Sequence, residues 1–128
     1  MPLVGFLPAD DPRMVSTVAA IEKELTKDGF LLRYDTSQSD DELSGDEGAF
    51  LACSFWLVDN MLLQGRRDEA EALFDRLLSL RNGVGLLAEQ YDVENEAMAG
   101  NFPQAFSHFA MIDAAFNLAG DQRGAHAG

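Results

Sequence analysis

The chain has little positive charge and almost no cysteine. Only 9 lysine and arginine residues stand against 22 aspartate and glutamate residues, which gives its 128 residues a net charge of −13. This charge repels phosphate groups, and no local cluster of basic residues offsets it, so we expect neither nucleic acid nor a membrane surface as a partner. The single cysteine, Cys53, cannot form a disulfide within the chain, and its apolar neighbours predict a small buried side chain.

Targeting signals and several motifs of catalysis are also missing. The first residues, MPLVGFLPADDP, are apolar but too short to span a membrane, and they lack the basic region of a signal peptide, so a cytoplasmic protein is expected. The sequence contains no glycine-rich phosphate loop, CxxC pair, HExxH or GxSxG. The sequence places no second histidine near His108, and it therefore predicts no metal site.

What the chain does have is helical periodicity. Asp10 or Asp11 followed by Pro12 predicts a helix start, with apolar residues at spacings of three and four and an end at Gly29. Residues 48–63 are apolar on almost every side, which is typical of an inner helix covered on most faces.

The second half of the chain continues this pattern. Residues 67–80 carry one apolar stripe, which predicts a half-exposed outer helix, and Gly65 separates them from the inner helix. After a turn-rich segment and a polar loop over 93–101, a last helix is expected from Pro103 to Leu118. Residues 120–128 are expected to form a disordered tail.

These elements predict an all-α fold built from helical hairpins. Two architectures stack hairpins in this way, namely an open solenoid such as a tetratricopeptide array and a closed toroid of paired helices. The segment GRRDEAEALFDRLLSL is typical of the second helix of a tetratricopeptide unit, but no second copy follows at a period of about 34 residues. A helical-repeat module that binds a peptide in a groove is the second interpretation.

Four stretches in order resemble glycoside hydrolase family 15, the family of glucoamylases and of bacterial trehalase-like enzymes. The stretches are VGFLPADDPR, EGAFLACSFWLVDNMLLQGRRDEAEALFDRLLSLRN, GLLAEQYD and GNFPQAFSHFAMIDAAFNL. The resemblance implies that residues 1–119 are a C-terminal segment of the catalytic domain and form about a third of an (α/α)6 toroid. It also implies hydrolysis of an α-glucoside, of the maltooligosaccharide or trehalose class, without a cofactor.

The catalytic candidate is Glu89. Taken alone it is one of many acidic residues, but LLAEQYD resembles the family segment whose glutamate is the general base. Inverting enzymes need a carboxylate that deprotonates water and a carboxylic acid that protonates the leaving oxygen. The resemblance places the acid upstream of this segment, so we expect the 128-residue chain to be inactive alone.

Substrate contacts are expected from residues on both sides of the acidic loop. The resemblance implies that Arg33 contacts sugar hydroxyls, although an ion pair with Asp35, Asp40 or Asp41 would explain it equally well. Glu47, like Asp46, either contacts substrate or opposes the dipole of the inner helix.

Aromatic and amide side chains supply further candidates. Gln90 and Tyr91 flank Glu89 and would either bind a sugar or pack against the core. For Trp56 core packing is favoured over sugar stacking, and for His108 a structural hydrogen bond is favoured. A third of a toroid would leave inner-helix surface exposed, which predicts a homo-oligomer formed through that surface.

Overall fold

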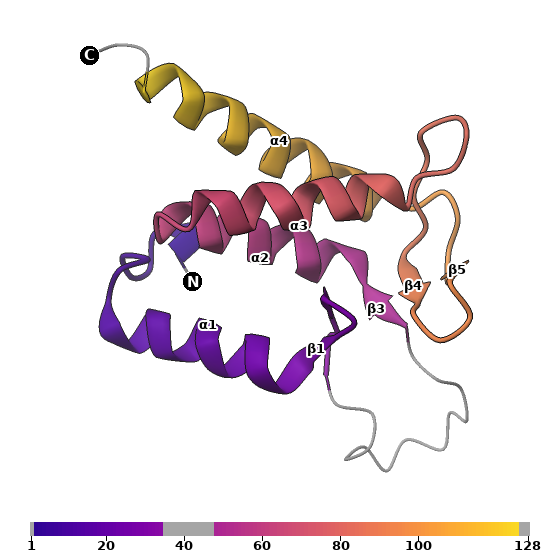
Figure 1. Cartoon of the computed structure of the whole chain (residues 1–128), viewed down its shortest axis with the longest axis horizontal. Coiled ribbons are helices and arrows are strands. Elements are labelled where there is room, and N and C mark those ends of the chain that lie inside the picture. The colour runs from indigo at the N-terminus through magenta and orange to yellow at the C-terminus, as the bar shows by residue number, and fades with distance from the viewer. Residues whose placement is uncertain (1, 35–47, 126–128) are drawn as a thin grey trace.

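The computed structural model describes residues 2–34 and 48–125. Four α-helices dominate it, and these are α1 (Pro12–Leu25), α2 (Leu51–Leu63), α3 (Arg67–Ser79) and α4 (Ala105–Ala125), preceded by the short 3-10 helix η1 (Pro2–Val4). Figure 1 shows α2 between α1 and α4, with α3 in front of α2. The expected helices are therefore present, and α4 continues beyond the predicted end at Leu118.

Two small sheets correct the all-α prediction. The first pairs β1 (Thr26–Lys27) with β2 (Phe30–Leu31), and the second has β4 (Gln90–Asp92) between β3 (Ala49–Phe50) and β5 (Ala97–Ala99). All neighbouring strands are antiparallel. Strands of two or three residues are too short to show an alternating pattern, and β3 finds its partner some forty residues along the chain, so periodicity could not predict them.

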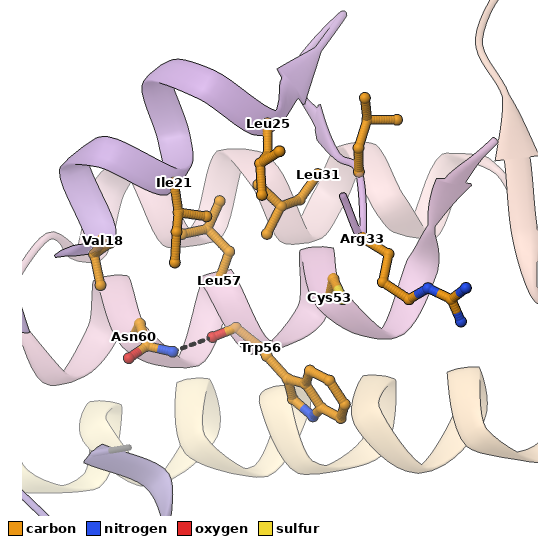
Figure 2. Close-up of a pocket in the computed structure, with 10 residues that line it drawn as sticks. Val18, Ile21, Leu25, Leu31, Arg33, Cys53, Trp56, Leu57 and Asn60 are labelled. Carbon is orange, nitrogen blue, oxygen red and sulfur yellow. Dashed lines mark hydrogen bonds between the residues drawn. The ribbon is translucent and has the colours of Figure 1, made fainter. Parts of the chain in front are cut away.

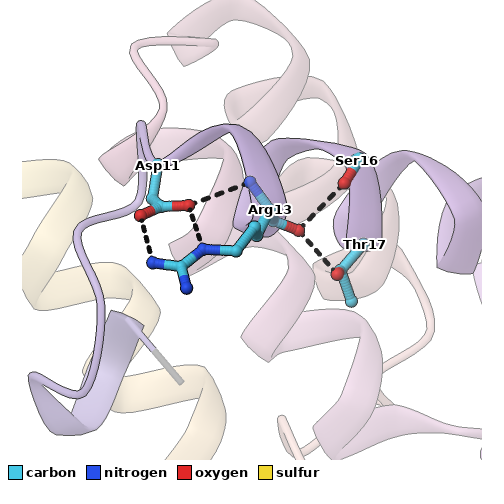
Figure 3. Close-up of polar contacts among 4 residues, drawn as sticks. All are labelled: Asp11, Arg13, Ser16 and Thr17. Atoms are coloured by element: carbon cyan, nitrogen blue, oxygen red, sulfur yellow. Dashed lines mark hydrogen bonds and ion pairs between the residues drawn. The ribbon is translucent and has the colours of Figure 1, made fainter.

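The start of α1 follows the prediction closely. Asp11 is the N-cap, and its Oδ1 accepts a hydrogen bond from the backbone N–H of Arg13 at 2.9 Å. The guanidinium of Arg13 donates to both carboxylate oxygens, and this bonding lowers the pKa of Asp11 to about 2 (Figure 3). The hydroxyls of Ser16 and Thr17 bond the carbonyl of Arg13 and complete the first turn.

The end of α1 differs from the prediction. The helix stops at Leu25, four residues before Gly29, and the chain then turns back as β1 and β2. Asp28 and Gly29 form this turn with φ angles of 48° and 77°, in the left-handed region that glycine adopts without steric cost. Gly29 therefore serves a hairpin turn rather than a helix end.

The core is centred on α2. Leu51, Phe55 and Val58 have no exposed surface, and residues of α1, α3, α4 and β2 pack against them. The hydroxyl of Ser54, also fully buried, accepts the backbone N–H of Leu31 at 2.9 Å and ties the first sheet to this helix. The prediction of an inner helix covered on most sides is confirmed, although Cys53 is half-buried rather than enclosed.

Helix α4 is covered on one side only. Its small buried residues Ser107, Ala110 and Ala114 face the core, whereas a row of large apolar side chains is exposed (Phe106, Phe109, Ile112 and Phe116). The apolar surface that the sequence predicted along residues 48–63 therefore lies mainly on the last helix. No helix among the described residues is long and apolar enough to cross a membrane.

Candidate functional site

Glu89 lies where the N-terminal ends of α2 and α4 meet. Its backbone carbonyl accepts the N–H of Leu51, the first residue of α2, at 3.1 Å. The two preceding residues, Leu87 and Ala88, are buried, and their carbonyls accept hydrogen bonds from the N–H of Gln104 at 3.0 Å and the hydroxyl of Ser107 at 2.8 Å. Both helices therefore hold the backbone of the LLAEQYD segment in place.

His108 adds a further support to this segment. The backbone N–H of Leu87 donates to its Nε2 at 3.2 Å, so the opposite nitrogen, Nδ1, carries the proton and donates to the carbonyl of Gln104 at 2.7 Å. The ring therefore bridges the loop and the first turn of α4. The prediction of a structural hydrogen bond for His108 is confirmed.

Glu89 is a half-buried residue, and one of its two carboxylate oxygens accepts hydrogen bonds. Oε2 accepts the backbone N–H of Asn101 at 3.2 Å and its side-chain amide at 2.9 Å, while the N–H of Glu89 donates to the carbonyl of Asn101 at 2.9 Å. Among the described residues, Oε1 has no hydrogen-bond partner. One carboxylate oxygen is thus fixed and the other is left to accept a proton from a bound molecule.

Gly100 allows this arrangement because it has no side chain. A Cβ at Gly100 would lie 3.0 Å from both Cβ and Oε2 of Glu89, and the backbone there has a φ of 74°. Any other residue would be strained and would push the carboxylate away. The GN pair before Phe102 therefore shapes the immediate surroundings of Glu89.

Gln90 and Tyr91 continue from Glu89 into β4. Oε1 of Gln90 accepts the backbone N–H of Gly48 at 3.3 Å, and Gly48 itself must lack a side chain because a Cβ would come within 2.8 Å of the Tyr91 carbonyl. The Tyr91 ring meets the ring of Phe30 edge to face, with centroids 5.5 Å apart. Both side chains thus make packing or backbone contacts, the alternative to sugar binding that the sequence left open.

Arg33 and Trp56 line a different feature, an apolar groove of about 240 Å³ between α1 and α2. Figure 2 shows Cys53 and Leu31 between the α1 side chains and Arg33, while the Trp56 ring extends toward α4. The indole is 37% exposed and meets the Phe106 ring at 5.4 Å, so Trp56 is only partly a core residue. Glu89 does not line this groove.

Aromatic rings connect Arg33 with the Glu89 end of the molecule. The Arg33 guanidinium lies over the rings of Tyr34 and Phe50, 5.0 and 5.8 Å from their centroids. Phe50 in turn is 6.3 Å from Phe106 and pairs with Gln90 across the sheet. Arg33 therefore lies at the same end of α2 as Glu89.

Five acidic residues named as candidates belong to the part of the chain between the two described ranges. Asp35, Asp40 and Asp41 lie outside the described residues, as do Asp46 and Glu47. Within the described ranges, no group of three or more histidine, cysteine, aspartate or glutamate side chains is arranged to hold a metal ion.

Comparison with known proteins assigns this architecture to a family. Residues 1–116 match the family described as glycosyl hydrolases family 15. The chain belongs to this family. The glycoside hydrolase interpretation is thereby favoured over the tetratricopeptide-like module.

The relatives of this family 15 chain include several proteins named trehalase. The one from Mycolicibacterium smegmatis is 47% identical over 116 residues, which cover 91% of this chain and 17% of the relative. The one from Thermoplasma volcanium is 40% identical over 119 residues, covering 92% of this chain and 19% of the relative. The chain thus spans less than a fifth of the length of these trehalases, and no solved structure matches it.

Asn101 is the site residue that sequence reasoning did not find. It falls in the segment 93–101, which the sequence predicted to be a polar loop and which instead forms the β4–β5 hairpin and its return. The signal available was the GN pair directly before FPQAFSH in the family 15 stretch. The hydrogen bonds from Asn101 to Glu89 depend on the hairpin, so only the structure reveals them.

Proposed function

We propose that Glu89 is the general base of an inverting α-glucoside hydrolase. The observation that carries the proposal is that Asn101 holds the carboxylate of the half-buried residue Glu89 through Oε2, with Oε1 left to accept a proton from water. A base must be fixed in this way to deprotonate a water molecule on one face of the sugar while an acid acts on the other face. Membership of family 15 supports the same assignment.

Trehalose is the favoured substrate within the α-glucoside class, with maltooligosaccharides as the alternative. The support is that the relatives matching most of this chain are named trehalase. We further propose that Arg33 and Glu47 contact substrate hydroxyls, and that Gln90 and Tyr91 border the sugar. The position of Arg33 at the Glu89 end of α2, with its guanidinium over the Phe50 ring, supports a substrate contact.

The proposed fold of the complete domain is an (α/α)6 toroid, of which these residues form about a third. In this arrangement α2 and α4 are inner helices, while α1 and α3 are outer helices. The alternation is supported by α2, in which most residues are buried, and by the exposed sides of α1 and α3. The general acid would belong to a family segment that precedes this one, so the 128 residues alone are proposed to be inactive.

The exposed face of α4 supports the proposal of a homo-oligomer. Phe109 and Phe116 are 65% and 73% exposed, and neighbouring turns of the helix add Phe106 and Ile112. A contiguous apolar surface of this kind drives association because contact removes it from water.

A chimera tests the role of Glu89. The matching segment of the Mycolicibacterium smegmatis trehalase would be replaced by residues 1–116 of this chain, and hydrolysis of trehalose and maltose would be measured. We expect Glu89→Gln to lower kcat by about 10² to 10⁴ with little change in KM, because the amide cannot take the proton. The 128-residue chain alone should show no turnover of either sugar.

Glu94→Gln is the matched control for this chimera. Glu94 is an exposed carboxylate five residues along the chain, paired with Lys27 at 2.6 Å, and its loss should leave kcat within about twofold. Full activity of the Glu89→Gln chimera would refute the proposed base, and turnover by the isolated chain would refute its dependence on an upstream acid.

A further inference from the structure

A second, polar cavity lies away from the groove of Arg33. It has a volume of about 430 Å³ and is formed by the β1–β2 turn, the C-terminal end of α3 and the segment from Tyr91 to Glu96. Figure 1 places these elements at one end of the helical layer. Its lining residues are Asp28, Phe30, Arg76, Ser79, Leu80, Tyr91, Val93 and Glu96, whereas Glu89 is not among them.

Arg76 is held in this cavity by an aromatic ring and a glycine. Its guanidinium lies 4.5 Å from the centroid of Phe30 and directly against Gly29, where a side chain would overlap it. Among the described residues it forms no ion pair, although Asp28 and Glu96 line the same cavity. The planar guanidinium, positioned by stacking on the Phe30 ring, therefore presents N–H donors that no described side chain binds.

The two carboxylates stand on neighbouring hairpin turns. Asp28 and Glu96 both have left-handed backbone conformations, with φ of 48° and 50°. The ion pair of Lys27 with Glu94, at 2.6 Å, joins the same two turns. The carboxylate acceptors of the two hairpin turns and the guanidinium donors of α3 thus line one cavity. The Tyr91 and Phe30 rings form part of its wall.

We propose that this cavity is a second carbohydrate site, which binds a neutral disaccharide through its hydroxyl groups. A hydroxyl donates and accepts at once, so adjacent hydroxyls can satisfy the Arg76 donors and the carboxylate acceptors together. The proposal goes beyond the role of Glu89 and does not depend on it.

Charge and size select this class of ligand over others. An anion would bring a negative charge against Asp28 and Glu96, and a simple cation would leave the Arg76 donors unpaired. A zwitterionic amino acid satisfies both signs, but a cavity of about 430 Å³ is of the size that encloses much larger ligands. A disaccharide supplies enough hydroxyls to reach both hairpin turns and α3.

The test is a titration of the ¹⁵N-labelled 128-residue chain with trehalose and with maltose, followed by amide chemical shifts. We expect saturable shifts at Ser79, Tyr91 and Glu96 with at least one of the two sugars. Glu96→Gln, which keeps the side-chain shape, should weaken binding about tenfold, because a charged acceptor is lost. Arg76→Lys should weaken it as well, since a single ammonium cannot replace the planar fork.

Two control variants distinguish binding in this cavity from binding elsewhere on the chain. Glu94→Gln removes a carboxylate just outside the cavity and should change the affinity less than twofold. Glu89→Gln should leave the titration unchanged, so that the outcome is independent of the chimera assay. The proposal would be overturned if neither sugar gave saturation, or if the shifts were confined to the surroundings of Glu89 and Asn101. It would also be overturned if serine, titrated in the same way as a zwitterionic amino acid, bound while both sugars did not.

Discussion

Helices α2 and α4 are both rich in apolar residues, yet they differ in how many of these residues are buried. Eight of the thirteen residues of α2 are buried, because α1, α3, α4 and the first sheet surround it. Helix α4 buries a narrow row made of three small residues and Leu118, and it exposes four large apolar residues. The difference shows that burial is set by which neighbours are present, since an apolar side chain is protected only where another element covers it.

The two helices also differ in how they contribute to the site. Leu51 begins α2 and binds the carbonyl of Glu89, whereas the first turn of α4 holds the preceding residues through Gln104, Ser107 and His108. The covered helix thus anchors the catalytic candidate to the core. The half-covered helix anchors it from the side that remains open to a further element.

The largest difference between the two helices is expected in the free energy of unfolding when one phenylalanine on each helix is replaced by alanine. Phe55 of α2 is completely buried and meets Phe74 edge to face at 6.0 Å, so Phe55→Ala should lower the free energy of unfolding by about 3 to 5 kcal/mol. Phe109 of α4 is 65% exposed, and Phe109→Ala should change it by less than about 0.5 kcal/mol. Urea unfolding at a protein concentration where the chain is monomeric, followed by circular dichroism, measures both changes. Equal losses of stability in the two variants would contradict the expectation.

The exposed face of α4 can be tested by light scattering. The wild-type chain should have a mass above its 14.0 kDa monomer, and Phe109→Glu with Phe116→Glu should shift it to a monomer, because charges oppose burial of the surface. Val84→Glu, at an exposed apolar residue on the loop after α3, is the control and should leave the mass unchanged. A monomeric wild-type chain would contradict the proposed homo-oligomer.

A smaller effect is expected where the two helices meet through a buried carboxylate. Asp59 of α2 is 3% exposed and accepts a hydrogen bond from the Asn117 amide of α4 at 2.8 Å. Burial, opposed by this bond and assisted by the negative charge of Asp113, raises the pKa of Asp59. A raised carboxyl pKa means that folding stability falls as pH rises from the unfolded value near 4 through the folded value.

Asp59→Asn should therefore stabilise the chain at neutral pH. Its amide oxygen can still accept the Asn117 bond without a buried charge, and we expect Tm at pH 7 to rise by roughly 5 °C. The advantage should shrink below about pH 4, where wild-type Asp59 is protonated in both states. Thermal melts across pH measure this, with Asp75→Asn, at an exposed residue of α3, as the control. A lower Tm for Asp59→Asn at pH 7 would contradict the expectation.

Local signals predicted the helices well because their causes are local. Asp11 and Pro12 start α1 through a side-chain bond two residues away, and Gly65 ends α2 with a φ of 76°. Strand β3 was not predicted because Gly48, Ala49 and Phe50 match the start of an apolar helix. They extend instead along Gln90 and Tyr91, and no local pattern shows that pairing.

The sequence by itself determined that the chain is mainly helical, that a largely buried apolar helix lies within residues 48–63, and that the chain belongs to family 15. These follow from periodicity, caps and matched stretches, which depend on residues close together along the chain. Only the tertiary structure decided that Asn101 bonds Glu89, that Tyr91 and Arg76 share a cavity, and that the exposed apolar face lies on α4. Each of these joins segments distant in sequence, where packing rather than local preference determines which side chains meet.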